Sequence, residues 1–99
     1  MYRLEFTAEA KSSIARFKKS SPSAYKKIAK LLDELMEHPR TGLGRPEPLS
    51  GVGSICYSRR IDKKNRLVYD IYDEIVTVLI ITAEGHYHDK PLSMPEGCW

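Results

Sequence analysis

The stretch SICYSRRIDKKNRLVYDIYDEIVTVLIITAE, residues 54–84, decides the fold, because short polar turns divide it into three strand-like segments. Each segment is rich in β-branched and aromatic residues, the types that favour β-strands. The turn between the last two segments is the dipeptide Asp73–Glu74, short enough for a tight hairpin. We therefore predict an antiparallel meander with strands at residues 54–61, 66–72 and 75–84.

Upstream of the meander, the chain carries signals for one short strand and two helices. Residues 2–6 alternate between apolar and polar side chains, as a strand does. Thr7 can cap a first helix, and Ser21, followed by proline, can start a second. Apolar residues recur along the second helix at the spacing of one buried face: Tyr25, Ile28, Leu31, Leu32, Leu35 and Met36. A strand and two helices before a three-stranded meander make an α+β fold.

Alternation along the predicted strands sorts their side chains between two faces of the sheet. The face expected to meet the core carries Ile55, Tyr57, Arg59, Ile61, Leu67, Tyr69 and Ile71, with Arg59 at its edge. The opposite face carries Cys56, Ser58, Arg60, Arg66, Val68 and Asp70. Arg60 and Arg66 are therefore predicted to converge. They either form a functional site or are surface arginines that pair with neighbours such as Asp70.

Length and composition indicate a single globular domain spanning residues 1–99. Apolar residues make up 41% of the chain and charged residues 29%, an ordinary balance for a soluble protein. We expect no secretory signal, because Arg3 and Glu5 already stand in the opening residues and no apolar region follows them. The longest apolar run, residues 75–83, is too short to cross a membrane. We therefore expect a cytoplasmic protein without a membrane partner, in which Cys56 and Cys98 are reduced thiols. Residues 88–99 are predicted to form an irregular C-terminal extension.

The net charge of +3 is modest, but basic residues gather in the middle of the chain. Residues 40–66 hold only two acidic residues, Glu47 and Asp62, against Arg40, Arg45, Arg59, Arg60, Lys63, Lys64 and Arg66. Most of these basic residues are arginines, whose planar guanidinium group suits bidentate contact with phosphate. Such clustering indicates a nucleic-acid partner or an acidic protein partner.

The hexapeptide GRPEPL, residues 44–49, places a glutamate between two prolines inside a long loop, predicted at residues 40–54. The prolines fix their own φ angles and lack backbone donors, which argues against a central strand or a helix interior. Long loops between strong elements are commonly functional. The stiff backbone therefore either pre-positions Glu47 for chemistry or presents a surface carboxylate that pairs with Arg45.

The sequence GHYHDK, residues 85–90, directly follows the last predicted strand. Histidine changes its protonation near neutral pH, so His86 is a candidate acid or base. In an alternative interpretation, His86, His88 and Asp89 ligate a metal, since residues two apart on a strand face the same way. No further ligand cluster stands elsewhere in the sequence. Acid–base chemistry is the preferred interpretation, and no cofactor is expected.

Four motifs together resemble a known family. GLGRPEPLSG, SRRI, NRLVYDI and GHY, in this order after a strand and two helices, resemble the YoeB/Txe family of the RelE/ParE toxin superfamily. The resemblance extends from Met1 to about Tyr87. It implies a RelE-like toxin fold and the toxin of a bacterial type II toxin–antitoxin system, an endoribonuclease that cuts mRNA in the ribosomal A site without a metal. The implied partners are mRNA, ribosomal RNA, a YefM-like antitoxin and a second copy of the chain in a homodimer.

The resemblance also implies roles for individual residues. By position, the family's catalytic carboxylate falls on Glu47, its catalytic arginine on Arg66 and its catalytic histidine on His86. Glu47 would deprotonate the ribose 2′-OH, Arg66 with Arg60 would stabilise the phosphorane, and His86 would protonate the 5′ leaving oxygen. The residues expected to bind RNA are Arg60, Tyr87, Arg59 and Arg45.

Two other functions are compatible with the same fold. A ParE-like toxin would poison DNA gyrase, but such proteins lack the combination of PEP and GHY. A catalytically impaired module would bind nucleic acid or antitoxin without cutting RNA. Two departures from the family pattern keep this second alternative open: Ser50 stands where lysine is common, and Glu84 stands where arginine is common.

Overall fold

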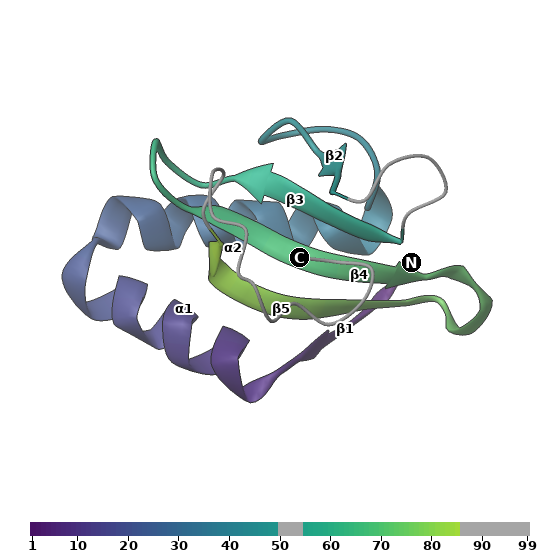
Figure 1. Ribbon diagram of the computed structural model, residues 1–99, viewed down its shortest axis with the longest axis horizontal. Coiled ribbons are helices and arrows are strands. Elements are labelled where there is room, and N and C mark those ends of the chain that lie inside the picture. The colour runs from purple at the N-terminus through teal and green to yellow at the C-terminus, as the bar shows by residue number, and fades with distance from the viewer. Residues whose placement is uncertain (50–54, 86–99) are drawn as a thin grey trace.

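The computed structural model of the protein describes residues 1–49 and 55–85. Its elements are β1 (Arg3–Phe6), α1 (Ala8–Ser20), α2 (Pro22–Glu37), β2 (Glu47–Pro48), β3 (Cys56–Arg60), β4 (Arg66–Tyr72), the 3-10 turn η1 (Asp73–Ile75) and β5 (Thr77–Gly85). The strands form one mixed sheet in the order β1-β5-β4-β3-β2, which Figure 1 shows together with the two helices. The predicted α+β class is confirmed.

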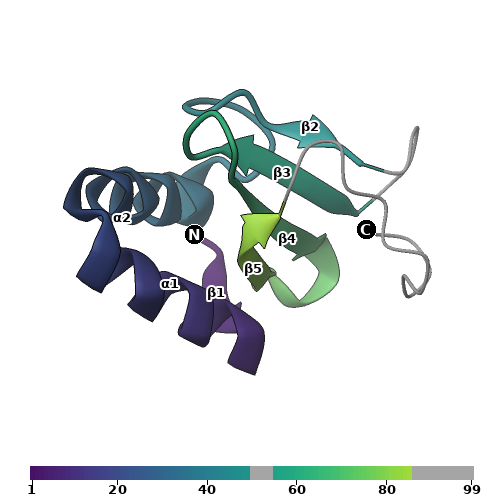
Figure 2. The same cartoon turned by 60° about the vertical axis from the view of Figure 1, so that its left-hand side comes forward.

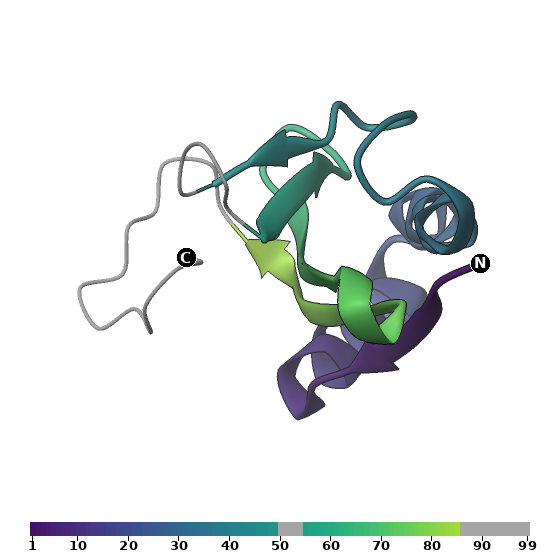
Figure 3. The same ribbon diagram turned by 90° about the vertical axis from the view of Figure 1, so that its right-hand side faces the viewer.

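Both helices cover the same face of the sheet, as the rotated views in Figure 2 and Figure 3 show. The core between the layers contains the predicted residues of the second helix and of β4: Ile28, Leu31, Leu35, Leu67, Tyr69 and Ile71. Complete burial of an aliphatic side chain contributes roughly 1.5–3 kcal/mol before the entropy cost of folding is counted. This core fixes which way each strand faces.

The side of the sheet turned away from the helices is called the outer face below. It carries Cys56, Ser58, Arg60, Arg66, Val68 and Asp70. The register supports this set, because β3 and β4 pair these residues directly: Cys56 with Asp70, Ser58 with Val68, and Arg60 with Arg66. Directly paired residues on neighbouring strands project to the same side. The division of side chains predicted from alternation is therefore confirmed for the paired residues of β3 and β4. Ile55, which was also predicted to face the core, precedes β3 and is exposed.

The two helices begin where the sequence predicts, but only one of them has a side-chain cap. The Thr7 hydroxyl oxygen accepts a hydrogen bond from the Ala10 amide at 3.0 Å, and the hydroxyl donates to the Ile81 carbonyl at 2.7 Å. Ser21 precedes α2, but its side chain makes no capping hydrogen bond. Thr7 therefore both starts α1 and ties it to β5. Neither α-helix of the described residues combines the length and apolar character needed to span a bilayer.

The sheet is larger than the predicted three-stranded meander. β1 pairs in parallel with β5, and β2 pairs antiparallel with β3 at the other edge. β2 is only two residues long and ends at Pro48. An edge position fits a proline, which cannot donate to a ladder. The predicted loop at residues 40–54 thus contains a short edge strand, and this strand holds Glu47.

The connection between β4 and β5 differs from the predicted tight hairpin. The chain makes the η1 turn, passes through Val76 at φ +50°, and begins β5 only at Thr77. Arg40 donates two hydrogen bonds to the Asp73 carboxylate at 3.1 and 2.8 Å, and the Tyr2 hydroxyl donates a third at 2.6 Å. The bond from Arg40 is the main reason that the pKa of Asp73 is lowered. These anchors hold Asp73 outside the ladder, so a two-residue turn does not form.

Cys56 does not have the predicted redox state. It is buried on the outer face in a small apolar cluster with Val68 and Ile81. It is also disulfide-bonded, so the prediction of a reduced thiol is wrong for this residue. Cys98 and the predicted extension at residues 88–99 lie outside the described residues.

Candidate active site

Two of the three predicted catalytic side chains meet on the outer face of the sheet. Arg66 Nη1 donates a hydrogen bond to Glu47 Oε1 at 2.8 Å, and the same nitrogen donates to Ser58 Oγ at 3.2 Å. The Glu47 side chain keeps 45% of its exposure, whereas the Arg66 side chain keeps 8%. The arginine is therefore fixed within the sheet, and the carboxylate remains open to solvent.

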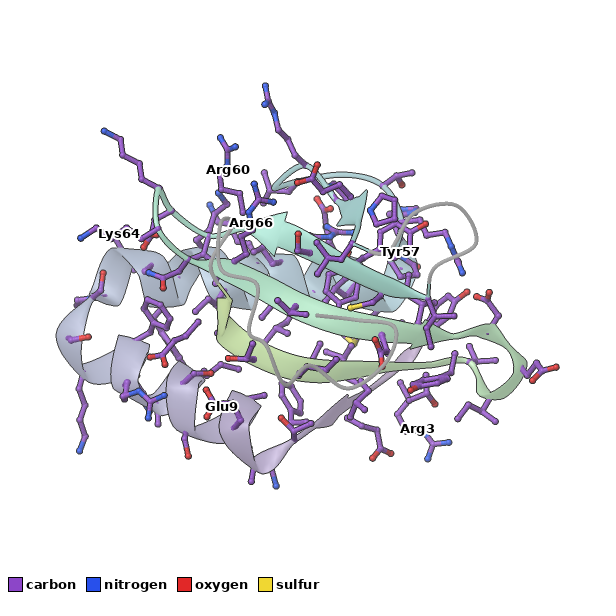
Figure 4. All side chains as sticks on the ribbon, viewed as in Figure 1. Arg3, Glu9, Tyr57, Arg60, Lys64 and Arg66 are labelled. Atoms are coloured by element: carbon purple, nitrogen blue, oxygen red, sulfur yellow. The ribbon has the colours of Figure 1, made fainter. Side chains whose placement is uncertain are left out.

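The register of the sheet explains this meeting. Glu47 lies opposite Ser58 on β3, and Arg60 lies opposite Arg66 on β4. Figure 4 shows Arg60 and Arg66 close together near Lys64, at the end of the β3–β4 hairpin. Arg60 is exposed. The arrangement gathers one carboxylate from β2 and two guanidinium groups from β3 and β4, and guanidinium groups bind phosphate well.

A left-handed turn directs the chain into β2. Gly44 has φ +81° and Arg45 has φ +53°, both in the region that L-residues rarely adopt. The Gly44 carbonyl accepts a hydrogen bond from the Arg60 amide at 2.7 Å, which fixes the turn against β3. Arg45 is exposed. The salt bridge of Glu47 is made to Arg66, so the alternative in which Glu47 pairs with Arg45 is not the arrangement found.

Replacing Gly44 with alanine is expected to lower the free energy of unfolding by at least about 1–2 kcal/mol, the cost of a left-handed residue with a Cβ. An added Cβ would also lie 3.0 Å from Leu31 Cδ2 and 3.1 Å from the Arg60 carbonyl oxygen. Urea unfolding of the purified protein measures the change. Ser12→Ala, at an exposed position on α1, is the control and should leave stability within about 0.5 kcal/mol. Equal stability of the two variants would contradict the assigned turn.

Arg59 does not occupy the position expected of an RNA-binding residue. It is fully buried on the helix side of the sheet, and all five of its N–H donors are bonded. The acceptors are the Tyr69 hydroxyl at 3.1 Å, Glu34 Oε1 at 2.8 Å, the Leu43 carbonyl at 3.2 Å, the Thr41 carbonyl at 2.8 Å and the His38 carbonyl. A side chain without exposed surface cannot contact RNA in this conformation, so the prediction that Arg59 binds RNA is wrong for this structure.

Two partners of Arg59 are themselves locked in place. Burial raises the pKa of Tyr69 to about 12, so its hydroxyl stays protonated and donates to the Pro39 carbonyl at 2.8 Å. The hydrogen bond from the Leu43 amide, at 2.8 Å, lowers the pKa of Glu34, and Arg59 adds to this effect. The sequence did place Arg59 on the core face of a strand, which is a signal for burial. No sequence pattern predicted which loop carbonyls Arg59 binds.

The third catalytic candidate follows the last described residue of β5. Gly85 ends β5 and pairs with Arg66 on β4. His86 and Tyr87 lie outside the described residues, as do Ser50, His88 and Asp89. Within residues 1–49 and 55–85, no group of three histidine, cysteine, aspartate or glutamate side chains is arranged to hold a metal.

Glu84, which departs from the family pattern, contacts the first helix. Arg16 donates to its carboxylate through Nε at 2.8 Å and Nη2 at 2.6 Å. Arg16 also lies 3.6 Å from Glu9 of the same helix. The acidic residue therefore joins α1 to the end of β5, one residue before Gly85.

Comparison with known proteins agrees with the motifs. A family model described as a YoeB-like toxin of bacterial type II toxin–antitoxin systems matches residues 6–87. The toxin YoeB of Mycobacterium bovis is 45% identical over 62 residues, which cover 63% of this chain and 71% of that protein. The toxin YoeB of Streptomyces coelicolor is 35% identical over 85 residues, covering 86% and 99%.

Solved structures of a Staphylococcus aureus protein share the fold. Its YoeB dimer superimposes with a TM-score of 0.76 and 30% identity, over 87% of this chain and 98% of that one. Its YoeB–YefM complex superimposes with a TM-score of 0.72, also at 30% identity, over 88% and 99%.

Proposed function

Because the chain belongs to the family of YoeB-like toxins of bacterial type II toxin–antitoxin systems, we propose that it is an endoribonuclease that cuts ribosome-bound mRNA. The observation that carries the proposal is the 2.8 Å contact between Glu47 and Arg66 on the outer face. Cleavage of RNA by its own 2′-OH needs a base and a cation beside one phosphodiester. These two side chains supply both.

The reaction assigns one step to each residue. Glu47 removes the proton of the 2′-OH, whose oxygen attacks the adjacent phosphorus. Arg66 and Arg60 stabilise the negative charge of the phosphorane. His86, the residue after Gly85 in the chain, protonates the 5′-oxygen as its bond to phosphorus breaks. The products are a 2′,3′-cyclic phosphate and a 5′-OH, and each acid–base partner contributes on the order of 10²–10⁴ in rate.

Substrate binding falls to the exposed members of the predicted set. Arg60 and Arg45 are exposed and can contact phosphates on either side of the cut. Tyr87 stacks on a neighbouring base. Arg59 is left out of this set because it is buried. An enzyme that acts on translating ribosomes works in the cytoplasm.

The partners of the chain follow from its relatives. The Staphylococcus aureus structures are titled as a YoeB dimer and as a YoeB–YefM complex, which supports a homodimer and a YefM-like antitoxin here. An acidic antitoxin segment, disordered until it binds, would cover the basic residues around Arg60 and Arg66. This cover would keep RNA away from Glu47.

Primer extension on defined ribosome complexes tests the proposal. The purified full chain is added to ribosomes stalled with a known codon in the A site, and the ends of the message are mapped. We expect one cut within that codon and none in the same mRNA without ribosomes. Breaks in DNA with intact mRNA would instead favour the ParE-like function. Binding to ribosomes without any cut would favour the impaired module.

A further inference from the structure

A group of contacts lies behind the Glu47–Arg66 pair, on the helix side of β3. Arg59 stands between Ser58 and Arg60 in the chain, yet it is buried on the side opposite to theirs. Three of its five hydrogen bonds go to backbone carbonyls, those of His38, Thr41 and Leu43. A buried guanidinium with every donor satisfied holds its partners in one geometry.

Those carbonyls belong to the loop that leads directly to Glu47. The Leu43 amide also donates a hydrogen bond to Glu34 Oε1 at 2.8 Å. The carbonyl of the next residue, Gly44, accepts a hydrogen bond from the Arg60 amide. The loop is therefore fixed at several points before the chain turns into β2. Only two residues then separate Gly44 from Glu47.

β2 alone cannot place the carboxylate well. The strand has two residues, and the second, Pro48, has no N–H to donate to the ladder. The Leu49 amide adds one hydrogen bond to the Cys56 carbonyl at 2.9 Å, but an edge pairing this short remains weak because few hydrogen bonds oppose its fraying. Catalytic groups need placement within about 0.5 Å, supplied by contacts behind them. The contacts of Arg59 supply that support here.

We propose that Arg59 is a positioning residue for Glu47, which holds residues 38–43 so that the carboxylate meets Arg66. The part of this proposal that concerns catalysis rests on the proposed nuclease function. A displacement of about 1 Å at a reacting group can cost on the order of 10² in rate. Lysine at this position keeps the positive charge beside Glu34, but its single nitrogen cannot reach all three carbonyls. The cleavage rate of Arg59→Lys should therefore fall, while its affinity for the ribosome is unchanged.

A double-mutant cycle distinguishes positioning from general destabilisation. Arg59→Lys is expected to slow single-turnover cleavage by roughly 10–10²-fold at saturating ribosomes, with the half-saturating concentration unchanged within about 2-fold. In the Glu47→Gln background, the same change should cost no more than about 2-fold further, because the group that it positions is gone. Ile28→Val, a small deletion in the core, is the control, and it should have the same small effect in both backgrounds.

Two results of the cycle would overturn the proposal. An equal loss of rate in both backgrounds would make Arg59 a general structural residue. A raised half-saturating concentration with an unchanged rate would make it a contact to RNA. Glu34→Gln provides a second variant should Arg59→Lys fail to fold, since Glu34 is only partly buried and binds the same loop at Leu43. Glu34→Gln should also slow cleavage only when Glu47 is present, by a smaller factor than Arg59→Lys.

Hydrogen exchange separates this proposal from the proposed function. In the full chain, Arg59→Lys should speed exchange at the Leu43 amide by about 10-fold or more, while β4 amides stay protected. Unchanged exchange at Leu43 would overturn the positioning role whether or not the protein cuts RNA. If the wild-type chain leaves mRNA intact but the exchange result is found, only the nuclease assignment fails.

Discussion

Glu47→Gln is expected to slow cleavage of ribosome-bound mRNA by roughly 10²–10⁴-fold, the contribution of a general base. Glutamine keeps the size of the side chain and an oxygen that Arg66 can reach, but it cannot take a proton from the 2′-OH. The fold should survive, because the Glu47 side chain is nearly half exposed and sits at the sheet edge. The measurement is single-turnover cleavage of the A-site codon, together with growth after induction in cells without antitoxin.

The matched control for this variant is Glu74→Gln. Glu74 is exposed in the η1 turn, away from the β3–β4 turn that lies beside Arg60 and Arg66. The Glu74→Gln variant should cleave ribosome-bound mRNA and arrest growth as the wild type does. Full toxicity of Glu47→Gln would remove the base from the proposed reaction, whatever the behaviour of Arg66.

Arg66→Lys is expected to slow the same reaction by roughly 10²–10³-fold, the loss measured when one preorganised donor to a developing charge is removed. Lysine keeps the charge but not the planar fork, so it cannot bind Glu47 and a phosphate in the geometry of a guanidinium. Stability should fall by about 1–2 kcal/mol, because charged hydrogen bonds to Glu47 and Ser58 are weakened. Cleavage is therefore measured at a temperature where both proteins are folded.

Arg3→Lys is the matched control for the arginine. Arg3 is exposed on β1, at the edge of the sheet opposite to β2. Its replacement should leave the cleavage rate unchanged within about 2-fold. If Arg66→Lys behaved in the same way, a guanidinium at position 66 would not be needed and the charge alone would suffice.

The sequence predicted the parts of the fold that depend on periodic patterns. The apolar stripe of the second helix and the alternation of Leu67, Tyr69 and Ile71 decide which faces are buried, and burial energy enforces both. The same alternation brought Arg60 and Arg66 to one side, where the register pairs them. Local periodicity is sufficient for such statements, since it requires no knowledge of distant contacts.

What the sequence could not predict depends on contacts between distant segments. The parallel pairing of β1 with β5 and the anchoring of Asp73 by Arg40 join residues more than thirty positions apart. Arg59 was placed at the edge of the core and expected to bind RNA, because its loop acceptors have no sequence signature. The predicted role of His86 is untested, since that residue lies outside the described part of the chain.

The departure at position 84 has a structural explanation in this chain. Glu84 is held by two hydrogen bonds from Arg16, so an acidic residue there joins the first helix to the last strand. This contact with Arg16 explains a glutamate at position 84 without any contact to RNA. The other departure, Ser50, lies outside the described residues.

Attack by the ribose hydroxyl at the scissile bond is the central claim, and one substituted message tests it most directly. An mRNA carrying a single 2′-deoxy nucleotide on the 5′ side of the A-site cut is placed in the stalled ribosome and incubated with the wild-type chain. Because Glu47 would then have no hydroxyl to deprotonate, we predict that this bond stays intact while the all-ribose message is cut. Cleavage of the deoxy-substituted bond at the normal rate would contradict the mechanism.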